Sequence, residues 1–184
     1  MFVGHVDLSS AWREPLERIA NSRKILNVGI LEGRVYPDEG EEAPEFIELN
    51  GEKIPNPFRN AKRQTNLPVA QVAYWQAYGT PTIPARPFFR NTLEDKQETW
   101  IRTVRVAMEN NGLDWESALT VLGERATKDI QQTIENHVPP PNSELTKAIK
   151  AAKGRAKPDA TLIDSGYMQD SIDYEVVDSN DDRD

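Results

Sequence analysis

The stretch from Val69 to Arg90 reads VAQVAYWQAYGTPTIPARPFFR. It predicts a helix over Pro68–Tyr78, with a proline in the first turn and almost no polar face. We expect a helix this apolar to be buried in the fold, or in the fold together with a partner. Gly79 is expected to end the helix. Prolines then exclude regular structure from Thr80 to Pro87, because each fixes its own φ and restricts the residue before it.

Two longer amphipathic helices follow this stretch. Apolar residues recur at helical spacing over Asn91–Asn110, where Asn91 or Thr92 is a candidate N-cap. Asp114 is expected to cap a second helix that runs to about Asn136. Because only a short turn separates the two helices, they are expected to form an antiparallel pair.

Strand signals lie far apart, towards the two ends of the chain. Lys24–Leu31 and Ile172–Val177 are rich in β-branched and aliphatic residues. Weaker periodicity predicts short helices over Ser10–Asn21, Leu145–Ala152 and Tyr167–Ser171. The combination predicts an α+β fold, in which a small mixed or antiparallel sheet packs against several helices.

A polar, proline-rich segment, residues 32–67, separates the first strand from the apolar helix. Within it, Asn50-Gly51 stands between two extended runs, which predicts a two-residue hairpin over Glu45–Pro55. We expect this hairpin to project from the body as an insertion. The chain is thus expected to form one α+β domain over residues 1–177, followed by an acidic disordered tail over residues 178–184.

Composition limits the classes of function. The 184 residues include no cysteine, which excludes disulfides, thiolate nucleophiles and cysteine zinc sites. The sequence contains no run of about 18 apolar residues, so we expect no transmembrane helix. The N-terminus lacks the pattern of a signal peptide. The net charge of −8 disfavours attraction of the whole protein to nucleic acid.

The charge is unevenly distributed along the chain. The stretch Lys147–Lys157 contains five basic residues and no acid, whereas acids dominate from Asp170 onwards. Such blocks are typical of a solvated loop and a disordered tail, and both are also compatible with a charged partner. The sequence leaves these two interpretations open.

Candidate catalytic groups are few. His5 and His137 stand apart from any metal-ligand spacing, and no nucleophile elbow, phosphate-binding loop or dinucleotide-binding glycine motif occurs. In Asp164-Ser165-Gly166 a serine follows an acid, but no base is in view, so we interpret it as a tight turn. We therefore expect no catalytic, cofactor-binding or metal-binding residues, and we expect that the protein is not an enzyme.

Three segments together resemble a known family. They are VAYWQAYGT at Val72–Thr80, IPARPFFR at Ile83–Arg90 and LIDSGYMQDSIDYEV at Leu162–Val176. In this order, with Pro140–Ser143 and Lys153-Gly154 between them, they are similar to motifs of the tail-completion, or neck, proteins of tailed bacteriophages, also described as virion morphogenesis proteins. The resemblance covers Leu26–Ile30 and most of Val69–Val177.

The resemblance implies a non-catalytic structural protein of the virion that is assembled in the host cytoplasm. It implies a ring, with a hexamer expected, that joins the portal-side connector proteins to the tail tube or tail terminator protein. DNA is expected to pass through the lumen without specific binding, and no cofactor is implied. The alternatives are a tail terminator, a minor capsid component or, from another class, a small DNA-binding regulator that acts through Lys147–Lys157.

The segment IPARPFFR supplies the first candidates for subunit contacts. Its prolines are expected to hold an extended connector that Phe88 and Phe89 anchor in the core. Arg86 and Arg90 are expected to present guanidinium groups to carboxylates across a fold or subunit boundary, with an internal salt bridge as the alternative. The full set of interface candidates is Trp75, Tyr78, Arg86, Phe88, Phe89, Arg90, Asp164 and Tyr167.

Overall fold

The structure is a computed structural model, and it describes residue 17 and residues 22–37, 42–60, 66–112 and 114–178. The described part folds into five helices and two small antiparallel sheets, so the predicted α+β class is confirmed. In chain order the elements are β1 (Lys24–Ile30), β2 (Phe46–Leu49), β3 (Glu52–Pro55), α2 (Val69–Tyr78), α3 (Phe88–Asn110), α4 (Trp115–Glu135), α5 (Glu144–Ala152), α6 (Tyr167–Asp170) and β4 (Ile172–Asp178). Apart from Glu17, the helix predicted over Ser10–Asn21 lies outside the described residues, as do residues 179–184 of the predicted tail.

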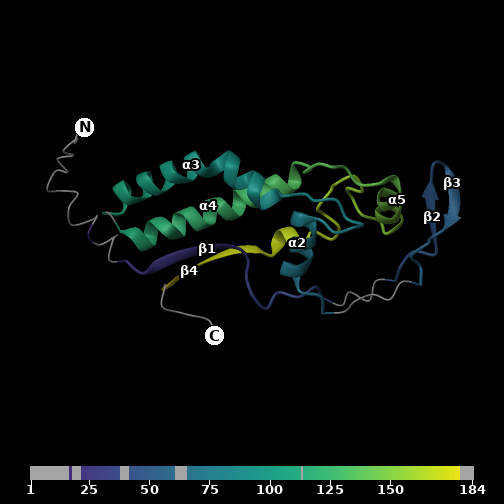
Figure 1. Ribbon diagram of the computed structural model, residues 1–184, viewed down its shortest axis with the longest axis horizontal. Coiled ribbons are helices and arrows are strands. Elements are labelled where there is room, and N and C mark those ends of the chain that lie inside the picture. The colour runs from purple at the N-terminus through teal and green to yellow at the C-terminus, as the bar shows by residue number, and fades with distance from the viewer. Residues whose placement is uncertain (1–16, 18–21, 38–41, 61–65, 113, 179–184) are drawn as a thin grey trace.

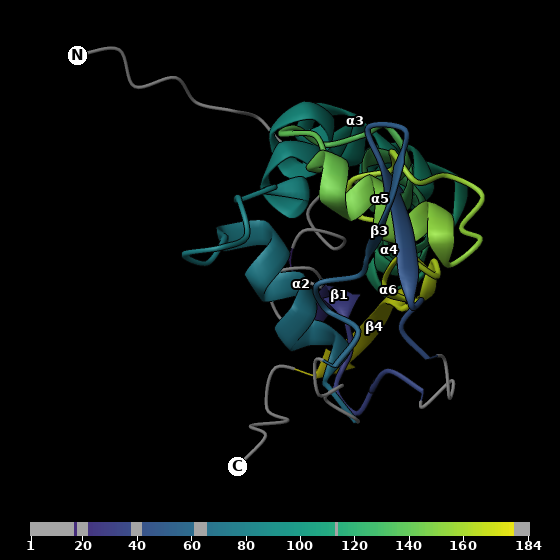
Figure 2. The same ribbon diagram turned by 90° about the vertical axis from the view of Figure 1, so that its right-hand side faces the viewer.

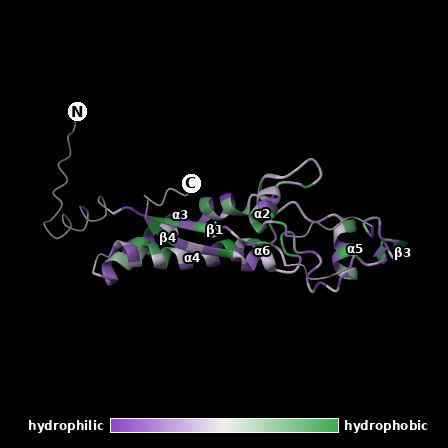
Figure 3. Ribbon diagram, turned by 90° about the horizontal axis from the view of Figure 1, so that it is seen from below, coloured by the Kyte–Doolittle hydropathy of each residue, from purple (hydrophilic) through white to green (hydrophobic). Residues whose placement is uncertain are grey.

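The helices α3 and α4 form the predicted antiparallel pair (Figure 1). Asp114 caps α4 as predicted, because its carboxylate accepts a hydrogen bond from the Ser117 N–H at 3.1 Å. Hydrophilic and hydrophobic residues are interspersed along both helices in Figure 3, as amphipathic packing requires. Within the described residues, no helix combines the length and apolarity that a membrane crossing requires.

The start of α3 differs from the prediction. The helix begins at Phe88, directly after Pro87, so the extended connector ends three residues earlier than expected. Neither Asn91 nor Thr92 is the N-cap. The Thr92 hydroxyl lies inside the helix and donates to the Phe88 carbonyl at 2.7 Å. The reason is packing, because Phe88 is completely buried and the helical turn that it begins is fixed by the core.

The strands β1 and β4 come from opposite ends of the chain and pair as predicted. Their antiparallel register runs from Lys24 opposite Asp178 to Ile30 opposite Ile172. Asp178 was assigned to the disordered tail, but it is the last residue of β4. Helix α4 covers one face of this sheet. The approach is close because position 123 on α4 is glycine, where an added Cβ would lie 2.2 Å from the Tyr174 ring.

Helix α2 contributes only one stripe of side chains to the core. Val69, Ala73 and Ala77 are buried there against residues of α3, α4, α6 and β4. On the opposite side, Tyr74 and Tyr78 are 60% and 73% exposed, with ring centroids 4.7 Å apart. The fold alone therefore does not bury this apolar helix.

The predicted hairpin is confirmed, and we call β2 and β3 with their turn, residues 46–55, the arm. Asn50 and Gly51 form the turn with φ values of 54° and 81°. The arm projects at the far end of the molecule from the sheet of β1 and β4, beyond α5 (Figures 1 and 2). It is not isolated, because β2 lies against α5 and Ile47 is only 2% exposed.

Candidate functional site

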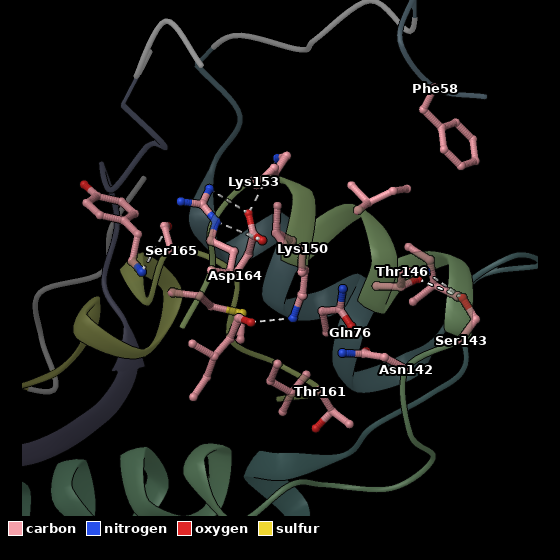
Figure 4. A pocket seen from close by; sticks show the side chains of 18 of the residues that line it. Phe58, Gln76, Asn142, Ser143, Thr146, Lys150, Lys153, Thr161, Asp164 and Ser165 are labelled. Carbon is pink, nitrogen blue, oxygen red and sulfur yellow. Dashed lines mark hydrogen bonds and ion pairs between the residues drawn. The ribbon is translucent and has the colours of Figure 1, made fainter. Parts of the chain in front are cut away.

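A cleft of about 1200 Å³ is lined by residues of α2, of α5 and of the segments on either side of the arm. Its lining comes from the end of α2, the connector to α3, the loop Pro140–Ser143, α5 and the turn that precedes β4. Phe58 and Arg59, which follow the arm, complete it. In Figure 4, Lys150 points into the middle of this cleft, with Gln76 and Asn142 on one side and Asp164 on the other.

Arg86 is placed in the cleft by the connector, which folds back onto the end of α2. Its N–H donates to the Gln76 carbonyl at 2.7 Å. This return passes so close to Gly79 that an added Cβ there would lie 2.9 Å from the Ala85 nitrogen. Gly79 has a φ of 79°, so a residue with a side chain would be strained as well as crowded.

The Arg86 guanidinium is buried at 5% exposure and bonds to neutral acceptors. It donates to the carbonyls of Pro140 at 2.8 Å and Pro141 at 3.3 Å, and to the side-chain oxygens of Gln76 and Asn142. Burial lowers the pKa of Arg86 from its ordinary value. For Arg86, the alternative of an internal salt bridge is therefore wrong among the described residues, because carbonyl and side-chain amide oxygens take the place of a carboxylate.

Asn142 extends this network across the cleft. Its side-chain amide donates to the carbonyl of Ala160 at 2.9 Å, while its side-chain oxygen accepts from Arg86. The loop after α4 is thereby tied both to the connector and to the segment after α5. Asn142 lies within the Pro140–Ser143 match, but the sequence pattern indicated neither of these bonds.

Lys150 completes the network from α5. Ser143 caps this helix through a 3.2 Å bond from the Thr146 N–H. Lys150 is only 7% exposed, and its ammonium donates to the carbonyls of Ala160, at 2.6 Å, and Ile163. Burial lowers the pKa of Lys150, and the neighbouring Arg86 and Arg155 charges also lower it while Asp164 opposes them.

The basic stretch Lys147–Lys157 is accordingly not a simple solvated face. Lys147 pairs with Glu144 and Asp159 at 2.9 Å and 3.4 Å. Arg155 and Lys153 reach the Asp164 carboxylate at 3.2 Å and 3.9 Å. The sequence could not reveal these pairs. Asp159 and Asp164 follow the stretch in sequence and approach its basic side chains only when the following turn folds back.

Asp164 and Tyr167 belong to the turn that closes the cleft before β4. Gly166 has a φ of 92°, and the Tyr167 N–H lies 3.4 Å from the Ser165 hydroxyl, which supports the interpretation as a tight turn. The Tyr36 ring packs on Tyr167 at a centroid distance of 5.4 Å. Burial, with a smaller effect of Asp164, raises the pKa of Tyr36 to about 12.

The fold thus divides the interface candidates into three groups. Arg86, Asp164 and Tyr167 line the cleft. Phe88 and Phe89 stack at 4.5 Å, with Phe88 in the core and the Phe89 ring against Gly29. On the surface, Tyr78 is exposed beside half-buried Trp75, and the 78% exposed Arg90 side chain pairs with Glu94 at 2.9 Å.

The buried cations Arg86 and Lys150 make the cleft suited to holding an anion. Among the described residues, no group of three or more histidine, aspartate or glutamate side chains is placed to hold a metal ion. His137 is exposed, and it is not among the residues that line the cleft. Ser165 has the Asp164 carboxylate beside it in sequence, but that carboxylate is engaged by Arg155.

Comparison with known proteins adds no relative. No family model matches the chain, and neither a curated protein nor a solved structure is similar to it.

Proposed function

We propose that the protein is a ring-forming structural component of the head–tail junction of a tailed bacteriophage virion, as its sequence resemblance implies. In this role it joins the portal-side connector to the tail tube or tail terminator protein, and it catalyses no reaction. DNA passes through the ring without specific binding. A tail terminator or minor capsid component uses the same kind of subunit contact and is the alternative.

The observation that carries the proposal is the convergence of the segments that bear the resemblance. Arg86 of the IPARPFFR segment bonds to the carbonyls of the Pro140–Ser143 loop. Asn142 of that loop and Lys150 both bond to Ala160, and Lys150 also holds Ile163 of the third segment. Segments that lie about 80 residues apart along the chain therefore form one hydrogen-bonded unit. This convergence supports a common structural role for the segments that bear the resemblance.

The exposed aromatic pair on α2 supports an assembly role. Tyr74 and Tyr78 form a contiguous patch, and Leu93 and Ile101 on α3 are also more than half exposed. Tyrosine is enriched at protein interfaces because its ring offers apolar area and its hydroxyl a hydrogen bond. A regulator that binds DNA through Lys147–Lys157 is disfavoured, since Lys150 is buried and Lys147 and Lys153 are paired with acids.

The mass of the full chain in solution tests the proposal. Sedimentation equilibrium over a wide concentration range is expected to show a closed ring of defined subunit number. The double change Tyr74→Ser and Tyr78→Ser is expected to release monomers with an unchanged circular dichroism spectrum. Val121→Ser, at an exposed apolar position on α4, is the matched control and leaves the ring intact. A monomer at every concentration contradicts a ring-forming protein.

A further inference from the structure

Two buried cations in the cleft have only neutral partners. Arg86 and Lys150 bond to carbonyl and side-chain amide oxygens, and no described carboxylate lies within ion-pair distance of either. Buried charges in proteins are normally paired, because removal from water is costly. The cleft therefore contains positive charge that the described part of its own chain does not neutralise by direct pairing.

Each of these cations also has a hydrogen-bond donor to spare. A guanidinium carries five N–H groups, and the described residues accept four hydrogen bonds from Arg86. An ammonium carries three, and two are used by Ala160 and Ile163. Both side chains line the same cleft and are close enough for the charge of Arg86 to affect Lys150. One carboxylate can satisfy two such donors.

The described lining of the cleft carries more basic than acidic side chains, although the protein is acidic. This lining includes five basic and two acidic side chains, whereas the complete chain has a net charge of −8. The lining also includes apolar residues such as Val72, Ile149 and Leu162. A cleft of this size, with buried cations in its lining, is suited to an extended peptide that carries carboxylates.

The last described residue, Asp178, lies at the opposite end of the molecule from the cleft (Figure 1). Lys24 contacts Glu116 at 3.6 Å and Asp178 at 3.4 Å, which places the end of β4 beside the start of α4. The cleft lies beyond the other end of α4, a helix of 21 residues and therefore about 30 Å long. Asp178 cannot reach the cleft of its own chain. The sequence that follows it carries Asp181, Asp182 and Asp184 against a single arginine.

We propose that the cleft binds the acidic segment Asp178–Asp184 of a neighbouring copy, whose carboxylates pair with Arg86 and Lys150. The contact joins opposite ends of successive subunits, and such head-to-tail interfaces form a ring when the rotation between subunits closes. This inference rests on the proposed ring-forming function. It names the partner of the cleft as a second copy of the same chain and gives Arg86 a role between subunits as well as within the fold.

Fluorescence anisotropy tests the contact directly. The probe is a labelled synthetic peptide of residues 176–184, VVDSNDDRD. The receptor is the full chain with Asp181→Asn, Asp182→Asn and Asp184→Asn, which removes competition from its own segment. Saturable binding is expected, and it weakens as salt rises from about 50 to about 500 mM. A peptide with asparagine in place of every aspartate is expected to bind at least about tenfold more weakly.

Variants of the receptor locate the binding site. Lys150→Met removes a proposed contact, and Lys153→Gln removes a second positive charge from the lining of the cleft, one that pairs with Asp164 at 3.9 Å. Each is expected to weaken peptide binding about tenfold or more. Lys147→Gln changes the same helix at a position outside the lining of the cleft and leaves binding unchanged. Binding that ignores Lys153→Gln and Lys150→Met, or that is equal for the asparagine peptide, overturns the inference.

Solution mass separates this inference from the proposed function. The receptor with three asparagines is expected to dissociate at concentrations where the unchanged chain forms rings. Rings that persist in this variant, with no peptide binding, refute the cleft contact and leave the ring proposal standing. If the unchanged chain is monomeric, the ring proposal is refuted. Peptide binding, or its absence, then shows only whether the cleft recognises the acidic segment.

Discussion

Arg86 and Arg90 stand four residues apart in one segment, yet the fold uses them differently. The buried Arg86 guanidinium ties four acceptors from α2 and the Pro140–Ser143 loop together. The Arg90 side chain is 78% exposed and makes a single ion pair with Glu94 one turn along the helix. Exposed pairs of this kind contribute little to stability, whereas buried bonds to a charged group contribute more.

We predict that Arg86→Lys lowers the free energy of unfolding by about 1–3 kcal/mol, because an ammonium cannot reproduce the planar fork of donors. Urea denaturation of the monomeric protein measures this loss. Arg90→Lys is the matched control, and its effect is expected to stay within about 0.5 kcal/mol. Equal losses for the two variants would contradict the internal role of Arg86.

Part of the candidate site could be predicted from individual residues. Arg86, Asp164 and Tyr167 line the cleft and were singled out by the resembling segments. Lys150 lies outside these segments, and although Asn142 belongs to the Pro140–Ser143 match, its role in the cleft was not predicted, because both side chains are fixed by carbonyl oxygens of distant loops. Every residue carries a backbone carbonyl, so neither composition nor spacing shows which carbonyl will accept a hydrogen bond from a given side chain.

At the scale of elements, the cap of α4 gives a dependence on pH. The Ser117 hydroxyl donates to Asp114, and this bond, with that from the Ser117 N–H, lowers the pKa of the carboxyl from its ordinary value. A lowered folded-state pKa stabilises the fold above the unfolded pKa, and this stability is lost as the pH falls through the folded value.

We predict that the melting temperature of Asp114→Asn lies below that of the unchanged protein at pH 6, and that the gap narrows as the pH falls below about 4. Asparagine retains the capping acceptor but carries no charge, so the comparison isolates the carboxylate. Thermal melts followed by circular dichroism measure the gap. Glu124→Gln, at an exposed position in the middle of α4, is the control. A gap independent of pH would contradict this origin.

The arm depends on α5 for its order. Ile47 is its buried side chain, while Phe46 on the opposite side is 43% exposed and lies under the Lys53 ammonium. A two-stranded hairpin alone is marginally stable in water, so the contact with α5 is decisive.

We predict that Ile47→Ala costs about 2–4 kcal/mol, because it removes the main apolar anchor of the arm. The loss is expected as local opening, since the core of α3, α4, β1 and β4 does not include the arm. Hydrogen exchange is expected to speed up over residues 46–55 and to stay unchanged over residues 115–135. Phe46→Ala serves as the matched control with little effect. Faster exchange throughout α4 would show instead that the arm and body unfold together.

Most elements could be predicted because their signals are local. Asn50-Gly51 specifies its turn, and Asp114 specifies the start of α4. The start of α3 was missed because the burial of Phe88 outweighs the preference for a polar cap. The close approach of α4 and β4 at Gly123 was also missed, because it depends on Tyr174, a residue 51 positions away.

At the scale of the whole molecule, the basic residues are largely used within the fold. The chain has 30 acidic and 22 basic residues. In the stretch Lys147–Lys157, Lys150 is buried and Lys147 has two acidic partners. Nucleic acid binding requires basic groups that can replace the counterions of phosphates, and these pairs leave little such charge.

We therefore predict that the full chain shows no measurable affinity for double-stranded DNA even at about 50 mM salt, because the net negative charge repels phosphates. Fluorescence anisotropy with a labelled duplex measures this. The double change Glu144→Gln and Asp159→Asn removes both partners of Lys147 and is expected to raise any residual affinity. Binding by the unchanged chain that falls linearly with the logarithm of salt concentration would instead support a DNA-binding regulator. Passage of DNA through the proposed ring instead requires that the chain does not bind the duplex, because each bound phosphate would slow the passage.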